Sequence, residues 1–161
     1  MQTNLAERYA NTADGREAED ILRKCVHCGF CTATCPTYQL LGDELDGPRG
    51  RIYQIKEVLE GATPTASMQT HLDRCLTCRS CETTCPSGVD YGRLADIGRK
   101  IVEKEVVRSW MQTVIRQAFI VAIPNRQLFS VLLRLGQILR PMMPAQIRRK
   151  IPKKKKAGPW P

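Results

Sequence analysis

Eight cysteines in two short runs are the residues of this chain whose type and spacing could do chemistry. The first run reads Cys25-Val-His-Cys28-Gly-Phe-Cys31-Thr-Ala-Thr-Cys35-Pro36, and the second reads Cys75-Leu-Thr-Cys78-Arg-Ser-Cys81-Glu-Thr-Thr-Cys85-Pro86. Both runs have the spacing C-x2-C-x2-C-x3-C-P, and the second copy lies 50 positions after the first. This spacing is typical of the ligands of 4Fe–4S clusters. The sequence therefore predicts two such clusters.

The fourth cysteine of each run is expected to reach across to the other run. The first three cysteines can wrap one corner of a cubane cluster, whereas the proline after the fourth favours an extended backbone there. In two-cluster proteins with this spacing, the fourth thiolate ligates the other cluster. We therefore assign one cluster to Cys25, Cys28, Cys31 and Cys85. The second is assigned to Cys75, Cys78, Cys81 and Cys35.

Zinc and disulfides are the competing interpretations of these cysteines. Structural zinc needs only two knuckles of two ligands each, which leaves the third cysteine and the Cys-Pro of each run unexplained. Disulfides need an oxidising compartment. The first thirty residues lack the apolar segment of a secretory signal, and the longest apolar run, 118–123, is far short of the roughly 20 residues of a membrane span. We expect a reducing, cytoplasmic setting, which favours metal ligands.

Ligation of every iron by a cysteine predicts that the clusters transfer electrons. Eight thiolates can fill all eight iron positions of two clusters, so no iron would be open to substrate. We therefore expect one-electron transfer along a short wire of two neighbouring clusters and no catalytic residue on this chain. Backbone amides and nearby cations would tune the potentials.

The segments around the runs predict an all-α fold. Apolar residues recur at helical spacing before the first run, between the runs and after the second, for example at Ala18, Ile21 and Leu22. Gly47 and Pro48 open the middle helix, and Asp90 caps the last. No useful stretch alternates apolar and polar residues as a strand does.

Charge divides the chain near residue 105. Residues 1–105 hold 13 Lys+Arg and 16 Asp+Glu, a net charge of −3, whereas residues 106–161 hold 12 Lys+Arg and no acid. We predict an all-helical domain with two 4Fe–4S clusters over 1–105, a basic helical extension over 106–147 and a basic Pro/Lys linker or tail over 148–161. In the extension, Pro124 should end one amphipathic helix and Pro141 a second.

The residues around the runs resemble a known family. Leu41-Gly-Asp-Glu-Leu-Asp-Gly-Pro-Arg-Gly-Arg-Ile52, Leu72-Asp-Arg-Cys75 and Cys85-Pro-Ser-Gly88 are similar to the α-helical ferredoxin domain of succinate dehydrogenase, heterodisulfide reductase and anaerobic glycerol-3-phosphate dehydrogenase subunits. The segment 42–52 and the helical extension resemble most the iron–sulfur subunits of glycolate oxidase. Such subunits continue into cysteine-rich domains with CCG-type repeats, and this chain has no cysteine after Cys85.

The resemblance implies a role inside an oxidoreductase complex. A partner subunit would oxidise a 2-hydroxy acid, glycolate, at FAD, and this chain would pass the electrons to a membrane acceptor such as quinone, in the cytoplasm or peripherally at the inner face of the cell membrane. A related lactate or glycerol-3-phosphate dehydrogenase is the first alternative. A cluster-bearing module that uses its basic tail on nucleic acid or membrane is the second; we expect no nucleic-acid partner, because no recognition motif accompanies the tail.

Several other residues allow two interpretations each. Residues 47–51, Gly-Pro-Arg-Gly-Arg, could dock a partner or tune a potential, or could start a helix with arginines solvated or paired to nearby acids. His27 and His71 could tune a cluster or relay protons, or could be ordinary half-exposed histidines. Phe30 could shield a cluster or simply pack. The basic helices could pack on protein, dock the flavoprotein or lie on anionic lipid.

Overall fold

The structure, a computed structural model, describes residues 1–142, 144–149 and 151–152. Within these residues every regular element is helical and none is a strand, so the all-α fold is confirmed. The chain divides into two compact units, Met1–Val107 and Arg108–Pro161. The predicted division at residue 105 and the start of a tail at residue 148 stay predictions, and the Lys153–Lys156 run lies outside the described residues.

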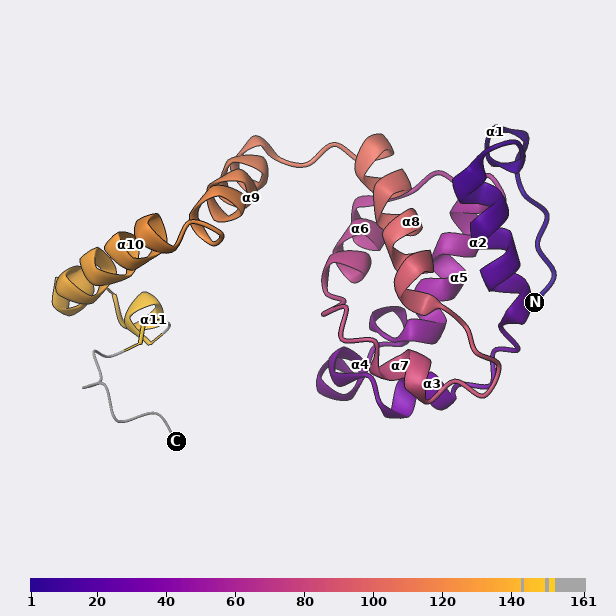
Figure 1. The fold of residues 1–161 in the computed structure, drawn as a ribbon, viewed down its shortest axis with the longest axis horizontal. Coiled ribbons are helices and arrows are strands. Elements are labelled where there is room, and N and C mark those ends of the chain that lie inside the picture. The colour runs from indigo at the N-terminus through magenta and orange to yellow at the C-terminus, as the bar shows by residue number, and fades with distance from the viewer. Residues whose placement is uncertain (143, 150, 153–161) are drawn as a thin grey trace. The chain divides into compact units, whose positions relative to one another are not determined.

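The helices of the first unit lie before, within and after the two cysteine runs (Figure 1). In chain order they are α1 (Glu7–Ala10), α2 (Ala13–Lys24), α3 (Phe30–Ala33), α4 (Pro36–Leu41), the 3-10 helix η1 (Glu44–Asp46), α5 (Pro48–Leu59), α6 (Ala66–Asp73), α7 (Ser80–Thr83) and α8 (Tyr91–Glu105). Those of the second unit are α9 (Trp110–Ala122), α10 (Arg126–Leu139), η2 (Arg140–Met142) and α11 (Ala145–Arg148).

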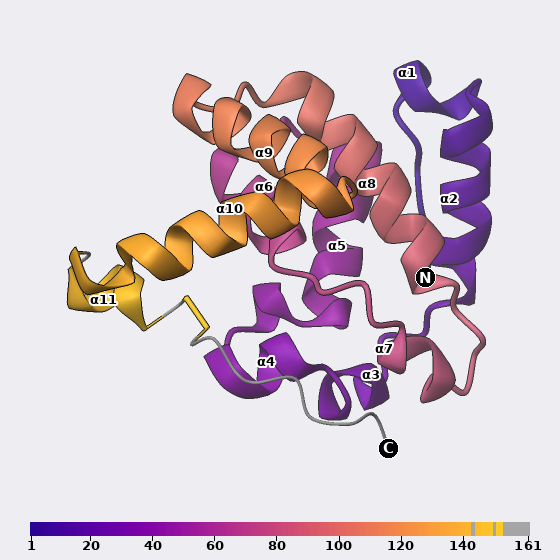
Figure 2. The same cartoon turned by 60° about the vertical axis from the view of Figure 1, so that its left-hand side comes forward.

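The core of the first unit lies between α2, α5, α6 and α8, which pack against one another (Figures 1 and 2). The helical stripes expected from the sequence are the buried faces of these helices, including Leu22, Ile55, Leu72 and Leu94. Helices α5 and α8 approach closely because residue 98 is glycine: a Cβ there would lie 2.6 Å from the Cγ1 of Ile55. The helices form a scaffold, and the cysteine runs are gathered at one end of it.

The two runs meet at equivalent positions. The short helices α3 and α7, which contain the third cysteine of each run, lie side by side in both views (Figures 1 and 2). The Thr84 hydroxyl donates a 3.3 Å hydrogen bond to the hydroxyl of Thr34, its counterpart 50 positions earlier. Thr34 in turn donates to the carbonyl of Ser80 at 3.2 Å. Hydrogen bonds therefore join the two runs, and one of them links the matching residues Thr34 and Thr84.

The second unit contains the two predicted amphipathic helices, α9 and α10, and no residue of either is buried. Each ends shortly before the proline that the sequence analysis identified. Among the described residues, no single helix is long and apolar enough to cross a membrane. Helix α9 and the stretch Arg126–Met142 meet the length and apolar requirement only as a pair, bent by 115°.

Candidate metal centre

The backbone of both cysteine runs follows the same unusual path. His27 and Thr77, the residues before the second cysteine of each run, have φ angles of 57° and 55°. Gly29 and Arg79, the residues after that cysteine, have φ angles of 87° and 58°. This left-handed conformation is costly for a non-glycine residue, above all for a β-branched one such as Thr77, and it persists where the surroundings demand it. Each run therefore contains a loop of the same strained conformation, and such backbone strain is typical of functional sites.

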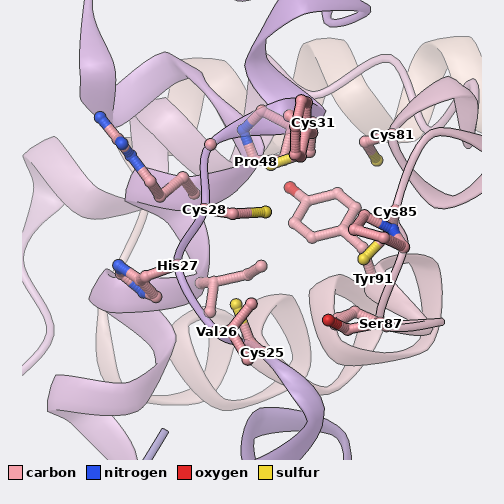
Figure 3. A pocket seen from close by; sticks show the side chains of 16 residues that line it. Cys25, Val26, His27, Cys28, Cys31, Pro48, Cys81, Cys85, Ser87 and Tyr91 are labelled. Carbon is pink, nitrogen blue, oxygen red and sulfur yellow. The ribbon is translucent and has the colours of Figure 1, made fainter.

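The first cavity is lined by the four cysteines assigned to the first cluster. Cys25, Cys28 and Cys31 line it together with Cys85 from the other run, and the cavity, which is partly open to solvent, has a volume of about 440 Å³. Figure 3 shows the sulfur atoms of Cys25, Cys28 and Cys85 directed toward this common space. The second run contributes two cysteines to this cavity, the predicted crossed residue Cys85 and also Cys81.

The second cavity has the complementary set. Cys35 from the first run lines it together with Cys75, Cys78 and Cys81, around about 400 Å³ of space. Three residues, Pro48, Cys81 and Tyr91, line both cavities. The two cavities are therefore neighbours that share a wall, as two adjacent cofactors require.

The donor set of each cavity fits a 4Fe–4S cluster. All eight cysteines are free, so none is used in a disulfide. A fully cysteine-ligated cluster needs four sulfur donors, and each cavity offers its predicted four; the first is also lined by Cys81, which belongs to the quartet of the second. The structure brings each predicted quartet together, and the ligation itself stays a prediction.

Burial differs among the eight thiols. Desolvation raises the pKa of Cys25 and of Cys31, and it raises the pKa of Cys81, which also lies near Cys31, to about 12. A hydrogen bond from Ser80 lowers the pKa of Cys78. Since ligands bind metal as thiolates, cluster insertion must release protons from the buried positions. Cys28 and Cys78, the second cysteines of the two runs, are exposed.

A buried ionic network adjoins the second cavity. The Asp46 carboxylate is fully buried and accepts hydrogen bonds from Arg74 at 2.8 Å and from Arg51 at 3.5 Å, and its Oδ1 lies 3.0 Å from His71 Nδ1. Desolvation opposes ionisation, but the hydrogen bonds to His71 and Arg74 keep the pKa of Asp46 below its ordinary value. The Arg51 guanidinium is itself buried and also donates to the His71 carbonyl at 2.7 Å.

The segment 47–51, His27, His71 and Phe30 are the residues for which the sequence allowed two interpretations each. The Gly47–Arg51 segment starts α5, and its arginines are paired: Arg49 with Glu44 at 2.9 Å on the surface, and Arg51 with Asp46 inside. His27 is partly buried and packs edge-on against Tyr53, whereas His71 is buried, so the expected half-exposed position is wrong for His71. Phe30 is 61% exposed.

Two residues near the second cavity, Tyr91 and Arg99, could not be identified as site residues from the sequence. The Tyr91 ring is buried, and its hydroxyl donates to the Cys75 sulfur at 3.6 Å. Arg99 donates to the carbonyls of Leu72 and Cys75 at 2.9 and 2.8 Å, and so holds the start of the second run. Both come from α8, whose apolar stripe predicted only packing.

Comparison with known proteins bears on this site. Residues 21–89, which include both runs, match the family described as 4Fe-4S dicluster domain. This match supports iron–sulfur clusters as the cofactors of the paired cysteine quartets.

Full-length relatives extend the match beyond this dicluster domain. The chain is 59% identical over 152 residues to the glycolate oxidase iron-sulfur subunit of Escherichia coli (strain K12), a match that covers 94% of this chain and 37% of the relative. It is 39% identical over 113 residues to the "Probable glycolate oxidase iron-sulfur subunit" of Bacillus subtilis (strain 168), covering 69% of this chain and 26% of the relative. The resemblance stated from the sequence is confirmed.

A more distant relative is the succinate dehydrogenase iron-sulfur subunit of Paracoccus denitrificans, 25% identical over 108 residues that cover 62% of this chain and 42% of the relative. The chain spans little more than a third of the length of the E. coli relative and about a quarter of the B. subtilis one. No solved structure matches the chain significantly.

Proposed function

We propose that this chain is the electron-transfer part of a flavin-dependent 2-hydroxy-acid dehydrogenase, acting on glycolate, and that it carries two 4Fe–4S clusters with crossed ligands. The observation that carries the proposal is the pair of adjacent cavities, each lined by the first three cysteines of one run and by the fourth of the other, with Cys81 lining both. The similarity to glycolate oxidase iron–sulfur subunits supports the choice of substrate class.

The residues of the chain have separate tasks in this mechanism. A 4Fe–4S cluster held by four thiolates supplies one-electron transfer and offers no open iron to a substrate. Cys81, Tyr91 and Pro48 hold the two sites against one another. The exposed Cys28 and Cys78 are the places where a donor and an acceptor can approach most closely. The electron donor would therefore approach one run and the electron acceptor the other.

The donor is proposed to be an FAD-binding subunit and the acceptor a quinone. We expect that glycolate, added anaerobically to the flavoprotein mixed with this chain, bleaches the visible absorbance of the clusters, because electrons reach them from the flavin. Lactate and glycerol 3-phosphate are the comparison substrates. Faster bleaching with either would assign the chain to the sibling dehydrogenase, and no bleaching with any of the three would contradict the proposal.

We further propose that α9 and α10 bind an anionic lipid surface, which would bring the clusters near a membrane quinone. On α10, Arg126 and Arg134 share a polar face, while apolar side chains such as Leu132 and Leu135 are exposed on the other. The absence of any acid from residues 106–161 makes this unit complementary to anionic headgroups. Exposed apolar and basic faces on one helix are typical of interfacial binding.

Cosedimentation with vesicles tests the lipid proposal. The chain should bind phosphatidylglycerol-containing vesicles and not pure phosphatidylcholine. Leu135→Glu should weaken binding at least about tenfold, because burying a leucine contributes about 1.5–3 kcal/mol. Gln137→Glu, which adds the same charge on the polar face, should weaken it only a few-fold. Equal effects of the two variants, or no binding to either vesicle, would favour a protein surface as the partner of these helices.

A further inference from the structure

We infer that Thr37, backed by the buried Arg51, hydrogen-bonds the Cys35 ligand and gives the cluster of the second cavity the higher reduction potential. This inference rests on the proposed two-cluster function and adds a direction to it. Electrons would pass from the cluster of Cys25, Cys28, Cys31 and Cys85 to that of Cys35, Cys75, Cys78 and Cys81. Thr37 is thus a positioning residue that acts through the ligand Cys35.

The three side chains form a relay that is closed to water. The Thr37 Oγ lies 3.2 Å from the Cys35 Sγ, and Arg51 Nη1 donates to the same Oγ at 3.2 Å. The Thr37 hydroxyl also lies 2.9 Å from the Asp46 carbonyl, to which it donates. The exposed fractions are 9% for Thr37, 7% for Cys35 and 0% for Arg51.

The position of Arg51 decides where the hydroxyl proton can go. A threonine hydroxyl has one proton, and its oxygen accepts other donors. Because Arg51 donates into the Thr37 oxygen, the hydroxyl proton is left for one of two acceptors, the Asp46 carbonyl or the Cys35 sulfur. Once Cys35 is a thiolate it is the charged acceptor, and hydrogen bonds to charged acceptors are about twice as strong as neutral ones. The proton then turns toward the sulfur.

Such a bond raises a cluster's potential. Hydrogen bonds to the ligating sulfurs are among the factors that set the potential, since they stabilise the more negative, reduced state. The buried Arg51 adds positive charge behind the bond, in a region where water screens it little. Tyr91 donates a second hydroxyl hydrogen bond to Cys75, another residue of the same quartet.

The repeat has no arginine at the position that matches Arg51. Fifty positions after Thr37 the chain has Ser87, next to Cys85-Pro86, so a hydroxyl is present. Fifty positions after Arg51, however, the chain has Ile101, whose side chain has no polar atom to donate. Each site therefore has four predicted cysteine ligands, but only the second has a threonine backed by a buried arginine beside one of its ligands. Ser87 is the natural matched control for Thr37.

Redox titration followed by EPR tests the inference on the full, cluster-loaded chain. Thr37→Val should shift the oxidised-to-reduced ratio of one cluster about tenfold, which lowers its potential by about 59 mV for one electron, and leave the other cluster unchanged. Thr37→Ser, which keeps the hydroxyl, should keep the native value. Ser87→Ala should shift neither potential. No shift in Thr37→Val, or an equal shift of both clusters, would overturn the inference.

A second measurement does not depend on how well Thr37→Val folds. In the native chain the two potentials should differ, and the cluster of higher potential should be the one lost in Cys35→Ala. Equal potentials, or the reverse order, would overturn the inference while leaving the two-cluster proposal intact. Iron analysis of the native chain separates the two failures, because a count well below eight would contradict the proposed function instead.

Discussion

Replacing Cys85 by alanine is expected to destroy the cluster of the other cysteine run. In the structure Cys85 lines the cavity of Cys25, Cys28 and Cys31, and the Cys85→Ala chain should therefore retain the same single cluster as Cys28→Ala. Cys35→Ala should likewise match Cys78→Ala, since both residues line the second cavity. Each variant should lose about half of its iron, because removing one of four thiolates leaves an iron without its ligand.

EPR spectra of the four reduced variants give the comparison. Crossed ligation predicts two pairs of identical residual spectra, Cys85→Ala with Cys28→Ala and Cys35→Ala with Cys78→Ala. Ligation within each run would instead pair Cys85→Ala with Cys78→Ala, and that result would refute the assignment. Iron and sulfide analysis on the same samples shows whether the residual cluster is complete.

Replacing Asp46 by alanine is expected to have the largest effect on stability of any change outside the cysteines. The carboxylate is completely buried and pairs with Arg51, which is also buried, and with Arg74 and His71. Removing one partner of a buried ion pair leaves an uncompensated charge and costs about 3–5 kcal/mol. The apparent melting temperature of the loaded chain should fall by more than roughly 10 °C.

Asp96→Ala is the matched control for Asp46→Ala. Asp96 lies 50 positions after Asp46 and is exposed on α8, so its removal should change the free energy of unfolding by no more than about 0.5 kcal/mol. Thermal unfolding followed by the cluster absorbance and by circular dichroism measures both. Similar melting temperatures for the two variants would show that the buried network contributes little.

The cysteine quartets could be predicted from the sequence because the repeat encodes them directly. Spacing alone grouped Cys85 with the first run and Cys35 with the second, and the two cavities of the structure contain these groups. Helical periodicity likewise predicted α2, α5 and α8, since one face of each had to be apolar to bury itself. Proline positions predicted the ends of α9 and α10 for the same local reason.

The Asp46 network could not be predicted, because its members look like surface residues. Asp46 and Arg51 lie in a segment rich in charges, and a short-range ion pair on the surface is the ordinary expectation for such residues. Burial follows only once η1 folds against α5 and α6, which brings His71 and Arg74 to Asp46 from 25 and 28 positions away. Gly50 permits this fold: a Cβ there would lie 2.0 Å from the Glu44 carbonyl oxygen.

The left-handed conformation of the second run could not be predicted from the sequence at Thr77 and Arg79. Gly29 is a residue for which a left-handed turn could be expected, but its counterpart is Arg79, and Thr77 is β-branched. Their positive φ angles are imposed by the surrounding cysteine run and not by local preference. Local sequence rules therefore fail at the candidate site, where the shape needed around the cavity overrides them.

The chain is proposed to hold two 4Fe–4S clusters in adjacent sites. The measurement that tests this proposal most directly is iron and acid-labile sulfide analysis of chain prepared without oxygen, together with EPR of the dithionite-reduced protein. Two neighbouring clusters should give about eight irons and eight sulfides per chain and a spectrum split by the interaction of two spins. Four irons with one uncoupled signal, or stoichiometric zinc in a folded colourless protein, would contradict the proposal.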